Sequence, residues 1–311
     1  MFSIPQDTKT GAHGDSDENP LILYDEPDDF RALCWIIYAL PKLYMDQFTS
    51  NTPDMKKLVS LYLIAHKYHF ETHESLARHL IHKSCTTNSA PTKTQSVSPA
   101  HLYFAKCPES RLRSVMQIAT LTRKADNGAL AIALQRLWIQ RLQQTSESVS
   151  TALEAGETLG LRNFLAESYY LELIRTKPVS VPGSDAYALH VHEDLTPRQK
   201  LTLYQGNWSL RIHWTKIVDE APKPFGNPSL DGEWKAAWER LSRREAIRKT
   251  FDPLEALATL RRELTSVASQ LRVVNFAPLY AAVDRITSEI KTSLPVHFLG
   301  PIPVAPQQAA A

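Results

Sequence analysis

Residues 21–85 constrain the fold more than any other part of the chain, because they read as one short strand followed by three helices. The apolar run at residues 21–24 is bounded by turn-forming residues, which is typical of a buried strand. A first helix is predicted to start near Pro27 and to end before Pro41, since proline is tolerated in a helix only in the first turn. Two further helices are predicted over residues 52–68 and 72–85, with Thr52 and Thr72 as N-caps.

The apolar residues of these helices recur at helical spacing and indicate which sides are buried. In the first helix the expected apolar face has members at i, i+3, i+4, i+7 and i+8, namely Phe30, Leu33, Cys34, Ile37 and Tyr38. In the second helix the expected face consists of Leu58, Leu61, Tyr62, Ala65 and Tyr68. Both helices are therefore predicted to contribute to one core.

The remainder of the chain is predicted to be nearly all helical. Residues 86–100 are rich in Ser, Thr and Pro and predict a linker. A helical region is predicted over residues 101–220, with a break near Gly160 and a new start at Thr196. Residues 229–295 are expected to hold C-terminal helices with a hairpin, and residues 296–311 a disordered tail. The leucine spacing of the hairpin leaves open an intrachain helix pair or a dimer interface.

Composition limits the kinds of partner. The 311 residues carry 35 basic and 33 acidic side chains, so the net charge of +2 provides no general attraction to nucleic acid or to a membrane surface. The longest apolar run, residues 33–40, is far shorter than the ~20 residues that span a bilayer. Three widely spaced cysteines suit a reducing compartment. We therefore expect an intracellular protein, cytoplasmic or nuclear, that binds neither nucleic acid nor membrane.

Two motifs in the first segment resemble the second half of a BTB/POZ domain, a module that binds proteins and catalyses no reaction. The pattern Phe-x-x-Leu at Phe30, followed by Ile37 and Tyr38, is similar to one helix of that fold. The pattern Ile-Ala-x-Lys-Tyr that ends at Tyr68 is similar to the Leu-Ala-x-Lys-Tyr signature of its next helix. The resemblance implies a mainly α fold, with an N-terminal α+β remnant over residues 1–85 and a helical region after it. It assigns nine residues to the BTB core or the partner-binding face: Leu21, Leu23, Phe30, Leu33, Ile37, Tyr38, Leu61, Ala65 and Tyr68.

A second likeness lies further along the chain. Segments around Tyr169, Thr196, Trp208 and the pair Trp234 and Trp238 resemble the helical C-terminal region of fungal BTB-domain proteins. Many of those proteins have Cys and His residues just before the paired tryptophans, and this chain has none there, which argues against a metal site. The N-terminal half of the BTB fold, with its usual dimer-forming segment, has no counterpart. The resemblance therefore leads us to expect either a truncated domain or a gene model that begins too late.

The resemblance implies a non-catalytic protein-interaction function without a cofactor. The partner is an unknown protein, and homo- or hetero-dimers are both open. A truncated domain is expected to leave part of the face of Phe30, Leu33 and Ile37 uncovered. One alternative is a substrate adaptor for a cullin-type ubiquitin ligase. Cullin-recruiting members carry a hydrophobic-x-Glu motif before the strand, and Ser16 in place of the hydrophobic residue before Glu18 weakens this alternative.

A metal-binding or enzymatic protein is the remaining alternative. Five histidines lie close together in one stretch and could contribute zinc ligands: His66, His69, His73, His79 and His82. A polar helix face explains them more simply, because zinc needs three or four convergent ligands. The basic run at residues 240–249 is interrupted by acidic residues and indicates a solvated helix face. No catalytic residue is predicted, since no catalytic arrangement can be read from the spacing.

Overall fold

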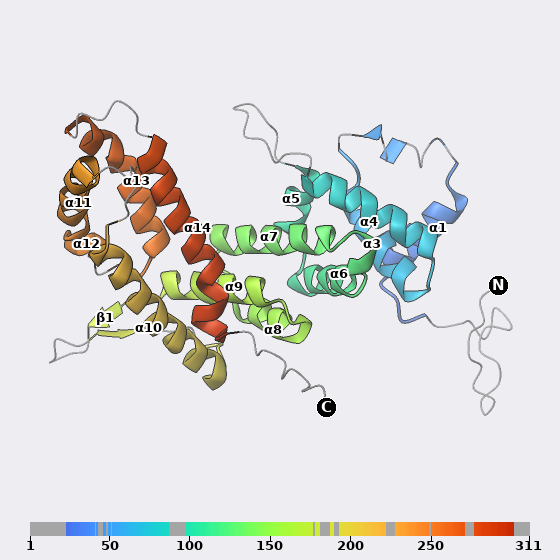
Figure 1. Ribbon diagram of the computed structural model, residues 1–311. Helices are drawn as coiled ribbons and strands as arrows, with labels where there is room; N and C mark the ends of the chain where they lie inside the picture. Colours follow the sequence, from blue (N-terminus) through green and yellow to red (C-terminus); the bar gives the residue numbers. More distant parts are fainter. Residues whose placement is uncertain are drawn as a thin grey trace, which may run out of the picture. The chain divides into compact units, whose positions relative to one another are not determined.

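The computed structural model describes residues 23–40, 42, 46–47, 49–50, 52–86, 98–176, 178–180, 187–189, 193–221, 228–248, 250–270 and 277–301 (Figure 1). Within these ranges the chain is helical apart from its connections and one short pair of strands, which confirms the mainly α fold. The chain divides into two compact units, Met1–Leu137 and Trp138–Ala311, and the division falls inside helix α7 (Ala129–Gln144). No helix among the described residues is both long and apolar enough to cross a membrane.

The N-terminal unit is a group of helices in which α3 packs against both α1 and α4. Its helices are α1 (Pro27–Tyr38), α3 (Met55–Lys67), α4 (Glu71–Thr86), α5 (Pro99–Phe104), α6 (Glu109–Leu121), the 3-10 helix η1 (Arg123–Ala125) and the first part of α7. The core is centred on α3, whose Leu58, Leu61 and Tyr62 are fully buried. The three helices predicted in this segment are therefore confirmed.

The starts of two of these helices differ from the prediction. Asp54, rather than Thr52, caps α3 by accepting a hydrogen bond from the Lys57 backbone N–H at 3.1 Å. Thr72 lies inside α4, not at its cap. The chain turns between α3 and α4 at His69, whose φ of 59° is left-handed and ends the earlier helix.

The predicted N-terminal strand is not seen in the described residues. Leu23 lies in neither a helix nor a strand, which contradicts its prediction, and Leu21 lies outside the described residues. A strand needs a neighbour to satisfy its backbone groups, and the described part of the N-terminal unit contains no other strand. The α+β character expected for residues 1–85 is therefore absent from the part that the structure describes.

The C-terminal unit contains the remaining elements: α8 (Ser150–Leu159), α9 (Arg162–Arg175), β1 (Pro178–Ser180), β2 (Tyr187–Leu189), α10 (Pro197–Asp219), α11 (Pro228–Ser242), α12 (Glu245–Arg248), α13 (Pro253–Gln270) and α14 (Ala277–Leu299). The predicted break occurs at Gly160, whose φ of 64° separates α8 from α9. The predicted start at Thr196 is confirmed, and the side chains of Thr196 and Gln199 form a capping box at the start of α10. The antiparallel pair of β1 and β2 was not predicted, because three-residue strands leave too short a pattern to detect.

Helix α14 organises the core of this unit by packing against α9, α10 and α13. It extends to Leu299, so the predicted disorder is wrong for residues 296–299, and the buried side chain of Phe298 explains why. Two tryptophans, Trp214 and Trp238, are buried in this unit. Their indole N–H groups donate to the backbone carbonyls of Ile247 at 3.0 Å and Val218 at 3.1 Å.

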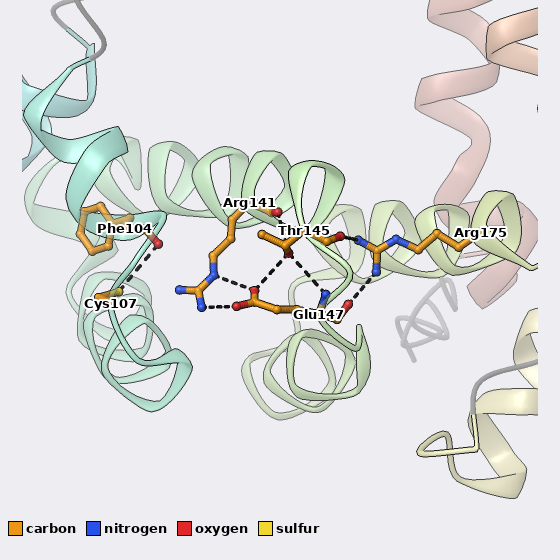
Figure 2. Close-up of polar contacts among 6 residues, drawn as sticks. All are labelled: Phe104, Cys107, Arg141, Thr145, Glu147 and Arg175. Carbon is orange, nitrogen blue, oxygen red and sulfur yellow. Dashed lines mark hydrogen bonds and ion pairs between the residues drawn. The ribbon is translucent and has the colours of Figure 1, made fainter.

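The connection between α7 and α8 is fixed by two arginines (Figure 2). The buried guanidinium of Arg141 donates to both carboxylate oxygens of Glu147, at 2.7 and 2.6 Å. Arg175 from α9 donates to the backbone carbonyls of Glu147 at 2.7 Å and Thr145 at 2.9 Å.

Figure 2 also shows Cys107, a buried residue of the N-terminal unit whose thiol donates to the carbonyl of Phe104 at 3.8 Å. These hydrogen bonds stabilise the segments that connect α5 to α6 and α7 to α8.

Candidate protein-binding surface

Helix α1 buries a different side from the one that its apolar spacing predicts. The buried residues have the spacing i, i+3, i+4 and i+7, and they are Asp29, Ala32, Leu33 and Ile36. Of the predicted face only Leu33 is fully buried, while Phe30, Ile37 and Tyr38 are exposed. Because each residue advances a helix by about 100°, the observed face is rotated by about a quarter-turn from the predicted one.

A buried ion pair accounts for this rotation. Asp29 is 8% exposed and its carboxylate binds the guanidinium of Arg111 from α6. Arg111 also donates to Ser60 Oγ at 2.5 Å and to the Tyr103 hydroxyl at 3.2 Å, so the cluster joins α1, α3, α5 and α6. A carboxylate this deeply buried is tolerated only when it is paired and hydrogen-bonded. The helix therefore turns Asp29 toward Arg111 and turns Phe30 and Ile37 outward.

The outward residues form what we call the α1 apolar surface: Leu23, Tyr24, Phe30, Ile37, Tyr38 and Leu40. The exposed fractions of Phe30, Ile37 and Tyr38 are 38%, 50% and 83%. Phe30 and Ile37 are two turns apart on one side of α1, and the half-buried Cys34 lies between them. Large apolar side chains are thus concentrated on a single short segment, as expected for a face that is partly uncovered.

The segment before α1 is fixed to the end of α3. Asp25 binds the ammonium of Lys67 and accepts a hydrogen bond from the Tyr68 hydroxyl at 2.6 Å. Burial acts to raise the pKa of Asp25, but the hydrogen bonds from Lys67 and Tyr68 outweigh it and lower that pKa. The Lys-Tyr pair of the second motif therefore has a structural use in this chain, because it holds the start of α1 in place.

The nine residues singled out in the sequence separate into two groups. Leu33, Leu61 and Ala65 belong to the core formed by α1 and α3, and Tyr68 is half-buried. The exposed group consists of Leu23, Phe30, Ile37 and Tyr38, and Leu21 lies outside the described residues. Sequence reasoning missed Asp29 and Arg111. The available signal was that Asp29 precedes Ala32 and Leu33 by three and four positions, on the side of α1 that is buried.

The histidine stretch contains an ion pair and a ring contact. His66 Nδ1 lies 3.2 Å from a carboxylate oxygen of Glu74, whose other oxygen binds Arg78 at 2.8 Å. His73 packs edge-on against Phe70. In the part of the chain that the structure describes, no group of three or more His, Cys, Asp or Glu residues is placed to hold a metal. Burial raises the pKa of the nearby Cys85 thiol to about 12, so this group is a poor nucleophile at neutral pH.

The basic run near residue 245 is neutralised by acidic partners. Each arginine of the following pairs binds a carboxylate on its own or a neighbouring helix: Arg243 with Glu239, Arg244 with Glu263, Arg248 with Asp219, Arg261 with Asp284, and Arg262 with Glu255. These ion pairs are largely exposed, as expected for a solvated helix face. They reduce the positive potential that a phosphate backbone would need.

Comparison with known proteins assigns no family to this chain. A scan against protein-family models found no match, and neither did searches of curated proteins and of solved structures. The likeness to the BTB/POZ fold therefore depends on the motifs quoted above. The α1 apolar surface is the feature of the described residues from which a function can be derived.

Proposed function

We propose that this chain is a non-catalytic protein-interaction protein that binds a partner protein through the α1 apolar surface. The observation that carries the proposal is the exposure of Phe30, Ile37 and Tyr38 on a helix whose opposite side is fixed in a core. Exposed apolar side chains gathered in one patch are typical of protein-binding sites. Burial of such a patch supplies the main driving force of association.

The spacing of the residues on this side of α1 suits a helix that docks in a groove of its partner. Phe30, Cys34 and Ile37 have the spacing i, i+4 and i+7, which is used by helices that present one apolar side to a partner. Tyr38 and Tyr24 add aromatic rings with a polar end, the kind of side chain enriched at the centres of interfaces.

The surface is presented by a helix that is already held in place. The ion pair between Asp29 and Arg111 fixes the buried side of α1, and Asp25 fixes the chain before α1. Side chains that are ordered before binding lose less conformational entropy when a partner binds. The proposed mechanism is therefore docking of a preformed surface, with little rearrangement of α1.

The BTB/POZ likeness supports the same function. In this proposal residues 1–85 correspond to the second half of that fold, and the later helices provide a second recognition surface. The partner is a protein of unknown identity, and a second copy of the chain is one candidate. A cullin remains the alternative partner that the family likeness suggests.

The test compares two isoleucines of nearly equal exposure. Ile37 is 50% exposed on α1, and Ile132 is 48% exposed on α7 in the same unit. The full chain and its Ile37→Glu and Ile132→Glu variants would each be purified from cells, and the bound proteins quantified by mass spectrometry. We expect a stoichiometric partner that is lost from Ile37→Glu and kept by Ile132→Glu, with equal thermal stability of the two variants.

The outcomes separate the candidate partners. A cullin lost only from Ile37→Glu would identify the adaptor function, and another protein lost in the same way would identify the scaffold function. Sedimentation of the purified chain would reveal self-association through the same surface. Equal retention of every partner by the two variants would contradict the proposal.

A further inference from the structure

Two histidines meet where the last turn of α14 lies on α10. His213 Nδ1 of α10 is 3.0 Å from His297 Nε2 of α14, and the ring centroids are 5.1 Å apart. The other ring nitrogen of His297 is 2.9 Å from Ser209 Oγ. Both nitrogens of His297 are therefore within hydrogen-bond distance of a partner on α10. We call Ser209, His213 and His297 the histidine cluster.

The last turn of α14 depends on side chains because the helix contains Pro295. Proline has no N–H to donate, so one backbone hydrogen bond of the helix is missing just before this turn. Arg162 compensates at the far end, where its guanidinium donates to the carbonyl of Gly300 at 2.6 Å. The turn is thus attached to the rest of the unit by contacts that do not belong to α14 itself.

Phe298 provides the apolar part of this attachment. Its ring stacks on Tyr169 of α9, with centroids 5.8 Å apart and an interplanar angle of 12°. It also lies directly over Gly206 of α10, where a Cβ would be 1.9 Å from the ring. The close approach places α10 and α14 near enough for the histidine rings to pair.

We propose that the histidine cluster is a pH-sensitive latch that keeps the last turn of α14 docked on α10 and releases it when both imidazoles are protonated. When both imidazoles are neutral, or when only one of them is positively charged, an N–H of one ring can face the lone pair of the other. When both imidazoles are positively charged, two N–H groups and two positive charges face each other at 3.0 Å, and the hydrogen bond is lost.

The surroundings offer little compensation for a second proton. His297 faces a cavity of about 620 Å³ whose charged lining consists of Glu157, Arg162 and Arg198. The one carboxylate, Glu157, accepts a hydrogen bond from the Tyr169 hydroxyl at 3.4 Å. The lining therefore carries more positive than negative charge before any histidine is protonated.

Other charged neighbours lie further along the helices. On α10, Lys216 is three positions from His213 and adds positive charge. The ion pair between Arg261 of α13 and Asp284 of α14 is more than about three helical turns from His297.

Burial and the charge of His213 lower the pKa of His297, and this direction sets the sign of the effect. A histidine released from the docked position has a pKa of about 6.5, so it binds a proton more tightly than the docked ring does. The docked state of the last turn of α14 on α10 therefore becomes less stable as the pH falls below about 6.5 and more stable as the pH rises.

The test measures amide hydrogen exchange of the full chain by mass spectrometry from pH 7.5 to pH 5.0, with EDTA present to remove bridging metal ions. Exchange rates are corrected for the intrinsic effect of pH. We expect the protection of the amides of Phe298, Leu299 and Gly300 to fall below about pH 6.5, by up to about tenfold per pH unit for each proton bound. Unchanged protection over this range would overturn the proposal.

Two variants locate the effect. His213→Gln keeps a hydrogen-bonding side chain that does not titrate, so the loss of protection at pH 5.0 is expected to disappear or shrink. His79→Gln removes an exposed histidine of the N-terminal unit and is expected to behave like the wild type. An unchanged pH response in His213→Gln would refute the latch.

A measurement on the wild type remains decisive if His213→Gln does not fold. The imidazole protons of His213 and His297 can be followed by NMR during a pH titration. We expect the second proton to bind at least about tenfold more weakly than the first, which separates the two steps by a pH unit or more. Two independent titrations near pH 6.5 would overturn the proposal.

Discussion

Helices α1 and α14 show when apolar spacing predicts the buried side of a helix and when it does not. The buried residues of α14 follow one another at intervals of three and four: Leu279, Val283, Ile286, Ile290, Leu294 and Phe298. This alternation places all six on one side of the helix. Helix α1 instead has apolar residues on nearly every side: Phe30, Ala32, Leu33, Trp35, Ile36, Ile37 and Tyr38. Spacing alone cannot show which side of such a helix is buried. In α1 the buried side is determined by the ion pair between Asp29 and Arg111.

The two phenylalanines test this comparison with the largest expected effect. Phe298 is 3% exposed and fills a site between α9 and α10, so Phe298→Ala should lower the free energy of unfolding by about 3–5 kcal/mol. Phe30 is 38% exposed, so Phe30→Ala should lower it by under about 2 kcal/mol. Chemical denaturation of both variants, followed by circular dichroism, measures the difference.

The order of the two losses is the decisive result. If Phe30→Ala cost as much as Phe298→Ala, Phe30 would be a core residue and the α1 apolar surface would be smaller than described. Gly206→Ala provides a control for the C-terminal site, because a Cβ there would clash with the Phe298 ring. Gly206→Ala alone should therefore lower the free energy of unfolding by about 1–3 kcal/mol. In a chain that already carries Phe298→Ala, the same substitution should lower it by much less, because the ring is gone.

The ion pair that orients α1 gives the next effect. Asp29→Ala leaves the guanidinium of Arg111 without its carboxylate in a largely buried position, and the free energy of unfolding should fall by about 3 kcal/mol. Replacing both partners, as Asp29→Leu with Arg111→Met, should recover most of this loss, because no unpaired charge remains. Thermal and urea unfolding measure both variants. A double variant no more stable than Asp29→Ala would show that Ser60 and Tyr103 need the charge of Arg111.

Much of the fold could be predicted from the sequence because its helices begin and end at strong local signals. Thr196 and Gly160 act through neighbouring backbone groups, and the structure confirms both boundaries. The short strands β1 and β2 could not be found in this way. Their pairing joins residues that are seven to eleven positions apart, which no local pattern reveals.

The candidate surface was only partly predictable. The motifs drew attention to Phe30, Ile37 and Tyr38, but they could not show that these residues point outward. That orientation depends on Arg111, which is 82 residues beyond Asp29 in the chain. The histidine cluster was likewise missed, since His213 and His297 are 84 residues apart. Helical spacing instead draws attention to the histidines of residues 66–82, which are close in sequence and are explained more simply by a polar helix face.

The α7–α8 connection sharpens the comparison of ion pairs, with the smallest expected effect. Arg141 is more deeply buried than Arg111, with 7% of its side chain exposed against 18%, but its partner Glu147 is 36% exposed. Glu147→Gln should therefore lower the free energy of unfolding at pH 7 by only about 1 kcal/mol, because water screens the carboxylate. Urea denaturation at a series of pH values measures this effect.

The pH dependence of the same variant identifies the cause. The hydrogen bonds from Arg141 lower the pKa of Glu147, so its contribution is present above the ordinary glutamate value of about 4.3 and is lost as the pH falls through the lower value. The stability difference between the wild type and Glu147→Gln should thus shrink toward zero in acid. Glu220→Gln, at an exposed position after α10, should show no such convergence. A difference for Glu147→Gln that stays constant down to pH 3 would mean that the side chain acts through its shape and not through its charge.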